Sequence, residues 1–200
     1  MAELTALRRS PLEHLNDQLD RTQGAQVTLN ELAFHTMTSI RVQPGSPAYL
    51  RISENIGAPL PVACGQTAVV NGHTSFWLGP DEWLVVSNAP APAHDPLSEL
   101  LLGALGGNHG AVVDVSANFT IVEITGAKAR SVLEKGCPVD LHPTAFAPGH
   151  AVLTTVGHIP VLLWQVDAHT YRLFPRASFA DYLTRWLLDA ASEYDGPEVP

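Results

Sequence analysis

The sequence has few of the residues that usually mark an oxidising compartment or a charged partner. Only two cysteines, Cys64 and Cys137, occur in 200 residues. They lie far apart and in no CxxC spacing, which favours a reducing cytoplasm and predicts two small buried side chains. Basic residues are also scarce, since 11 face 20 acidic ones and the formal charge is -9. We therefore expect no nucleic-acid partner.

Long apolar runs are absent as well. No stretch approaches the roughly 18 residues that a membrane-spanning helix needs. We therefore expect a cytoplasmic protein that has no membrane partner. At 46% hydrophobic residues, the chain can still bury one sizeable core.

The common catalytic and ligand-binding motifs are missing. The nine histidines form no HxH or HExxH pair, and His142 and His150 flank a proline loop, so they are read as scattered surface residues. No GxSxG, P-loop or GxGxxG motif occurs, and the glycines of residues 103–110 are better read as a helix exit. We predict that this chain contributes no catalytic, cofactor-binding or metal-binding residue.

Two carboxylates could be imagined as an acid–base pair. Asp114, however, ends a strand just before Ser116, where a loop or a helix cap is commoner than a catalyst. Glu123 alternates with apolar neighbours, so we expect it to face outward or to pair with a basic residue.

The segment from Gly110 to Leu141 is the centre of the predicted organisation. It reads as two strands, residues 111–115 and 120–125, followed by a short helix over residues 127–135. Gly136 stands where a left-handed residue commonly ends a helix.

Strand patterns dominate the rest of the chain. Asn71-Gly72 predicts a tight hairpin, and the last helix has a wide apolar face formed by Phe179, Tyr182, Leu183, Trp186, Leu187 and Ala190. A further helix begins at Asp95-Pro96 and is expected to point Leu97, Leu100, Leu101 and Leu105 inward. We predict an α+β fold with largely antiparallel sheets and packed helices. The remaining predicted strands are residues 34–42, 48–52, 67–70, 74–78, 83–86, 152–156, 159–166 and 171–174.

Three regions are predicted: an N-terminal arm over residues 1–25, one α+β domain over 26–191, and an acidic, disordered tail over 192–200. In the arm, Ser10-Pro11-Leu12-Glu13 is a capping-box pattern that starts a short helix. Leu12, Leu15 and Leu19 form a narrow stripe on that helix. The stripe could lie on the domain, but we predict that it docks on a partner and that its removal leaves the domain's stability nearly unchanged.

Large aromatic side chains cluster between residues 76 and 83. Strand alternation places Phe76 on one face and Trp77 on the other, so one aromatic side chain points away from the nearest core. Either a second layer of the same domain or a protein interface would cover it, and tryptophan is enriched at interfaces. Trp77 and Trp83 are therefore candidate interface residues, together with the three leucines.

Several segments together resemble the gamma subunits of heterotetrameric sarcosine oxidases, over roughly residues 10–190. The carrying stretches are Ser10-Pro11-Leu12, Trp77-Leu78-Gly79-Pro80-Asp81-Glu82-Trp83-Leu84, Val113-Asp114-Val115-Ser116 and Leu133-Glu134-Lys135-Gly136-Cys137-Pro138-Val139-Asp140-Leu141. The chain is more distantly similar to the folate-binding aminomethyltransferases of glycine cleavage. That likeness implies an aminomethyltransferase-like architecture with a ferredoxin-like component.

The chain departs from the aminomethyltransferases at their catalytic carboxylate. Aligning their motif on Gly157-His158-Ile159 places Val161 and Leu162 where the aspartates would stand. An alkyl side chain can neither accept a proton nor hold a charge, so aminomethyl transfer by this chain alone is not expected.

The resemblance implies a non-catalytic subunit of a complex that oxidatively demethylates sarcosine to glycine. The one-carbon unit would pass to tetrahydrofolate or leave as formaldehyde, with hydrogen peroxide as the other product. FAD, FMN, NAD and tetrahydrofolate would be bound by the other subunits, which are alpha, beta and delta, and none by this chain. The alternatives are a free folate-dependent aminomethyltransferase and a stand-alone binding module.

Overall fold

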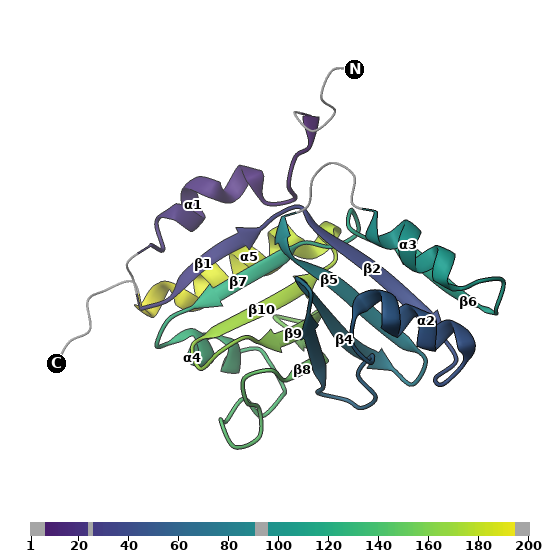
Figure 1. Ribbon diagram of the computed structural model, residues 1–200. Helices are drawn as coiled ribbons and strands as arrows, with labels where there is room; N and C mark the ends of the chain where they lie inside the picture. Colours follow the sequence, from purple (N-terminus) through teal and green to yellow (C-terminus); the bar gives the residue numbers. More distant parts are fainter. Residues whose placement is uncertain (1–6, 24–25, 91–95, 195–200) are drawn as a thin grey trace. The chain divides into compact units, whose positions relative to one another are not determined.

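The computed structural model describes residues 7–23, 26–90 and 96–194 (Figure 1). The chain forms two compact units rather than the predicted arm and single domain. Among the described residues, unit 1 comprises those of 34–117 together with Leu7 and Arg8, and unit 2 comprises those of 9–33 together with 118–194. The predicted division into an arm and one domain failed because residues 28–32, near the N-terminus, pair with residues 121–125 in unit 2. No local sequence pattern indicates that distant pairing.

Unit 1 is a five-stranded antiparallel sheet in the order β3-β4-β5-β2-β6. Helices α2 (Pro47–Ile56) and α3 (Leu97–Ala104) contribute to its core with residues such as Ile52 and Leu101, which meet Ile40 and Val85 of the sheet. The strands are β2 (His35–Val42), β3 (Thr67–Val70), β4 (His73–Gly79), β5 (Glu82–Pro90) and β6 (Gly110–Asp114).

Helix α2 replaces the predicted strand over residues 48–52. Ser46 caps it by accepting a hydrogen bond from the Tyr49 N–H at 3.2 Å, Pro47 occupies its first turn, and Gly57 ends it at φ +92°. These signals were present in the sequence, but the short apolar run Ala48–Ile52 does not by itself distinguish a strand from a buried helix segment.

Two other local predictions for unit 1 had different outcomes. The Asn71-Gly72 hairpin is confirmed, with φ angles of 48° and 78° that match the turn type asparagine-glycine favours. On α3, Leu97 and Leu101 are buried as predicted, but Leu100 is 51% exposed and belongs to the surface.

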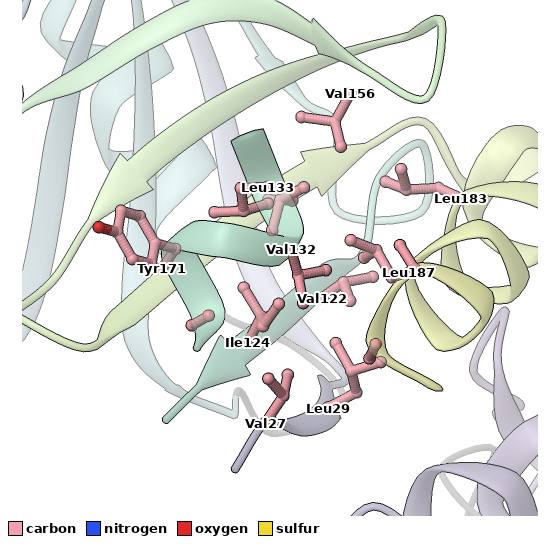
Figure 2. Packing of buried hydrophobic residues seen from close by; sticks show 14 of the residues in the cluster. Val27, Leu29, Val122, Ile124, Val132, Leu133, Val156, Tyr171, Leu183 and Leu187 are labelled. Atoms are coloured by element: carbon pink, nitrogen blue, oxygen red, sulfur yellow. The ribbon is translucent and has the colours of Figure 1, made fainter. Parts of the chain in front are cut away.

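Unit 2 is a second antiparallel sheet, in the order β1-β7-β10-β9-β8. Its strands are β1 (Thr28–Leu32), β7 (Ile121–Thr125), β8 (Ala151–Val156), β9 (Ile159–Gln165) and β10 (Thr170–Pro175). Its helices are α1 (Asn16–Asp20), α4 (Ala129–Glu134) and α5 (Ala177–Ala191), with short 3₁₀ turns at Glu13–Leu15 and Ser192–Tyr194. Figure 2 shows side chains of β7, α4 and α5 converging on one apolar cluster.

The end of α4 differs from the prediction. Its C-cap is Lys135 in the right-handed conformation, and Gly136 does not have a positive φ. Instead, a Cβ added at Gly136 would lie 2.5 Å from the Trp186 ring, and one at Gly157 would lie 2.8 Å from it. Both glycines therefore make room for the Trp186 side chain on α5.

The buried face of α5 is rotated from the predicted one. Leu183 and Leu187 are fully buried, as expected, but Phe179 and Tyr182 are 43% and 50% exposed. Ala180 is fully buried instead.

Part of the predicted disordered tail is ordered. Residues 192–194 form a 3₁₀ turn, and Lys135 contacts both Glu193 and the ring of Tyr194. Residues 195–200 lie outside the described part of the chain.

Candidate partner-binding surfaces

The three N-terminal leucines lie in the core of unit 2, which corrects the prediction that they are free to dock on a partner. Leu12 and Leu15 are fully buried and Leu19 is 4% exposed, and all three belong to the same cluster as Leu29 of β1. Their burial follows from β1, which brings the N-terminal segment onto the sheet. In Figure 1, α1 lies along β1.

The predicted capping box does not form. The first turn is a 3₁₀ turn that starts at Glu13, and no side chain caps it. A polar contact between side chains holds this segment instead. His14 Nε2 lies 2.6 Å from Asp181 Oδ1 on α5. The hydrogen bond from Arg185, followed by that from His14, lowers the pKa of the Asp181 carboxyl.

The tryptophans proposed as interface residues belong to the core of unit 1. Trp83 is 1% exposed, and its indole N–H donates a hydrogen bond of 2.7 Å to the Pro61 carbonyl. The centroids of the Tyr49 and Trp83 rings lie 5.7 Å apart. Trp77 is half-buried and packs against the same cluster. The second layer that covers these rings is therefore α2 with its following loop, so Trp83 cannot contact a partner without unfolding.

The positions aligned with the aminomethyltransferase acid lie in the middle of β9. Val161 is 3% exposed and belongs to the unit 2 core, and Leu162 is 4% exposed. Both are buried alkyl groups, so this strand presents no carboxylate at that place. The strand alternation points the two side chains to opposite faces of the sheet.

The two carboxylates considered as an acid–base pair each have a structural partner. Asp114 accepts hydrogen bonds from the Ser116 N–H at 2.8 Å and from its hydroxyl at 2.5 Å. Glu123 accepts a hydrogen bond of 2.8 Å from Arg172 Nε on β10, which confirms the predicted pairing with a basic residue. The Arg172 guanidinium also lies 5.4 Å from the Trp164 ring centroid. These contacts fit a structural role for both acids.

The described residues contain no group of three His, Cys, Asp or Glu side chains that could hold a metal ion. His142 Nδ1 lies 2.7 Å from the Thr144 hydroxyl in its own loop. Of the two cysteines, Cys137 is half-buried, whereas Cys64 is exposed, contrary to the prediction of two buried thiols. The glycines of residues 103–110 span the last turn of α3, the following turn and the first residue of β6, so the predicted helix exit lies there.

A cleft of about 330 Å³ in unit 1 was not indicated by the sequence. Its lining includes Arg41, Pro44, Asp81 and His109. Because these residues come from three separate segments, no local motif could have predicted the cleft. The hydrogen bond to Glu82 raises the pKa of the Arg41 guanidinium and holds it in an ion pair at 2.5 Å.

None of the helices among the described residues is long and apolar enough to cross a membrane.

Exposed apolar side chains are the remaining candidates for partner contact. Surface residues were missed by the sequence reasoning because exposure depends on which face each element buries. The more exposed ones among the described residues are Leu7, Leu50, Val62, Val69, Leu100, Leu102, Val113, Leu153, Phe179 and Tyr182.

Comparisons with known proteins agree with the resemblance. Residues 41–193 match the family model described as "Sarcosine oxidase, gamma subunit family". The sarcosine oxidase gamma subunits of an Arthrobacter species and of Corynebacterium strain U-96 are each 41% identical, over 100% of this chain and 97% of theirs.

Solved structures support the same assignment. A chain of the heterotetrameric sarcosine oxidase from Corynebacterium sp. U-96 superposes with a TM-score of 0.89 at 41% identity, covering 97% of this chain and 100% of that one. The glycine cleavage aminomethyltransferase T of Bartonella henselae matches with a TM-score of 0.64 at 12% identity, covering 91% of this chain and 57% of that one, which confirms the shared fold alone. The chain belongs to the sarcosine oxidase gamma subunit family.

Proposed function

We propose that this chain is the gamma subunit of a heterotetrameric sarcosine oxidase and that it has no active site of its own. The observation that carries the proposal is the structural match, over 97% of this chain, to a chain of such a complex, at a TM-score of 0.89. The full-length identity of 41% to gamma subunits supports it.

The complex oxidatively demethylates sarcosine to glycine. Its one-carbon unit passes to tetrahydrofolate or leaves as formaldehyde, and oxygen is reduced to hydrogen peroxide. The partners are the alpha, beta and delta subunits, and the complex works in the cytoplasm.

The lack of an active site is supported by the residues at the corresponding position of the aminomethyltransferase fold. Val161 and Leu162 are buried alkyl groups, and neither can exchange a proton with a folate or a substrate amine. Free aminomethyl transfer, the alternative function, would need a carboxylate there. A shared fold does not imply shared chemistry.

We also propose that FAD, FMN, NAD and tetrahydrofolate are held by the other subunits. A dinucleotide pyrophosphate is usually bound where a glycine-rich turn leads from a strand into a helix N-terminus. The glycine-rich segment 103–110 of this chain runs in the opposite sense, from α3 into β6. The segment therefore does not lead into a helix N-terminus, where its backbone amides could bind a pyrophosphate.

Co-expression with candidate alpha, beta and delta subunits tests the proposal. We expect this chain to elute with the others on size exclusion and sarcosine-dependent peroxide formation to require it. The chain purified alone should carry no yellow chromophore. Elution of this chain by itself, or a stoichiometric flavin on the isolated chain, would contradict the proposal.

The proposed absence of an active site would also be contradicted if His142→Ala or Cys137→Ala lowered turnover by orders of magnitude while the subunit content stayed normal. We expect both variants to stay within a few-fold of wild type, because neither residue belongs to a nucleophile or metal set.

A further inference from the structure

The outermost strand of the unit 2 sheet has an open hydrogen-bonding edge. Among the described strands, β8 pairs with β9 alone, in register from Ala151↔Trp164 to Val156↔Ile159. The N–H of Gln165 donates to the His150 carbonyl at 2.9 Å, which sets the alternation of this antiparallel pair. This alternation directs the backbone N–H and C=O groups of residues 151, 153 and 155 away from β9. No described residue donates or accepts a hydrogen bond there.

The opposite edge of the same sheet is covered. The Leu29 N–H of β1, which also points outward, donates a hydrogen bond of 2.9 Å to the Thr22 hydroxyl. Thr22 itself is held by a bond of 2.7 Å to the Leu19 carbonyl. One edge of unit 2 is therefore closed by its own chain, while the other is left open.

The sequence of β8 lacks the features that protect free edges. Natural edge strands usually carry a charge, a proline or a bulge, or are very short. β8 reads Ala-Val-Leu-Thr-Thr-Val, with no charged residue, no proline and no register shift against β9. It is the longest of the four edge strands, and its Leu153 side chain is 59% exposed.

The other edges are less suited to pairing. β3 has four residues, and β6 has five and ends in the charged Asp114. β1 carries Glu31 in addition to its hydroxyl cover. An open, neutral, β-branched strand of six residues is a template for one more strand.

We propose that β8 is a docking strand, on which an extended segment of a larger sarcosine oxidase subunit adds a sixth strand to the unit 2 sheet. This inference rests on the proposed function, because that function supplies the partner. Backbone hydrogen bonds at residues 151, 153 and 155 provide the attachment, and Leu153 selects an uncharged segment with an apolar side chain opposite it.

A second copy of this chain is the less suitable occupant. Each copy carries a formal charge of -9, so two copies repel each other, whereas a different subunit need not carry that charge. The relative's complex is also a heterotetramer with a chain named gamma, which leaves most contacts of such a chain to unlike subunits.

The variant Leu153→Pro tests the edge directly. In the wild type, the Leu153 N–H points away from β9. Proline at this position therefore removes the outward donor and blocks strand addition without removing a β8–β9 hydrogen bond. Val69→Pro on β3 is the matched control. Val69 is 62% exposed, and the Asn71-Gly72 hairpin directs its N–H outward as well.

Association is measured by recovery of the complex when the chain is co-expressed with its tagged partner subunits. We expect Leu153→Pro to reduce recovery by about tenfold or more and Val69→Pro to stay within about twofold of wild type. Circular dichroism of each isolated variant verifies that it is folded.

Hydrogen exchange on the wild-type chain gives a second measurement, which does not depend on a proline variant folding. The amides of Leu153 and Thr155 should exchange quickly in the isolated chain and slowly in the complex. The Val69 amide should exchange equally in both.

Three results would overturn the proposal. If the wild type assembles but its β8 amides exchange as in the free chain and Leu153→Pro assembles equally well, the docking strand is wrong while the proposed function stands. If the wild type joins no sarcosine oxidase subunit, the proposed function fails and the partner with it. If the β8 amides slow in the isolated chain as its concentration rises, the occupant is a second copy.

Discussion

Replacing Leu15 by alanine tests whether the N-terminal segment is part of the unit 2 core. The sequence alone predicts a stripe that the domain does not need, and hence an unchanged thermal midpoint when it is removed. In the structure Leu15 is fully buried, between Leu12 and Leu19 in sequence and in the same cluster as Leu29. We therefore expect Leu15→Ala to destabilise the isolated chain.

The magnitude follows from the burial. Truncating a fully buried leucine to alanine costs about 2–5 kcal/mol, from lost transfer free energy and the cavity left behind. A loss of about 3 kcal/mol lowers the midpoint of a protein of roughly 200 residues by about 6–12 °C. If unit 2 unfolds separately, the shift is larger, because a smaller unit has a smaller unfolding entropy.

The assay is thermal unfolding of the isolated chain followed by far-UV circular dichroism. Leu7→Ala is the control, since Leu7 is 77% exposed and its truncation should cost less than about 0.5 kcal/mol. A Leu15→Ala midpoint equal to that of the control would refute the reasoning. If assembly with partner subunits were weakened at the same time, the stripe would be a docking surface after all.

Three further predictions concern the interior and one surface carboxylate. Gly136→Ala should destabilise by about 1–3 kcal/mol, because its Cβ would lie 2.5 Å from the Trp186 ring; denaturant unfolding measures this. Trp83→Phe should cost about 1–3 kcal/mol in the same assay, because the Pro61 carbonyl loses its buried donor. Asp181→Asn should destabilise slightly at pH 7. A carboxyl with a lowered pKa stabilises the fold above its unfolded pKa of about 3.9, so the deficit should disappear as pH falls through the folded pKa.

Each of these predictions has a defined control. Gly103→Ala, on α3 with open space at its Cβ, should be neutral or stabilising, and an equal loss in both glycine variants would point to backbone freedom rather than to the ring. Trp77→Phe should cost less than Trp83→Phe, since Trp77 is only half-buried and no described hydrogen bond holds its indole. For Asp181→Asn, a deficit that persists where the wild-type carboxyl is protonated in the folded state would exclude the charge as its cause.

The assembled complex is the setting in which these stability effects matter. If the chain has no active site, as proposed, it contributes through its folded surfaces, and variants that unfold unit 2 should lower holoenzyme yield rather than turnover per complex. That separation distinguishes a packing subunit from a catalytic one.

Local chemistry determined most of the elements from the sequence alone. The Asn71-Gly72 turn, the strands of residues 111–115, 120–125 and 152–156, and the last helix were predicted because their signals are contained within a few residues. The family resemblance was also readable, since it depends on the order of short motifs. The lack of a carboxylate at Val161 and Leu162 needed only an alignment.

Tertiary structure alone decided which faces are buried and how the chain divides. Leu12 and Trp83 looked like interface residues because an isolated stripe or aromatic has no visible partner in sequence, yet β1 and α2 cover them. Phe179 looked buried because a helical pattern gives the width of an apolar face but not the angle at which the helix meets its sheet. The open edge of β8 could not be read at all, because a strand becomes an edge only through the order in which distant segments pair.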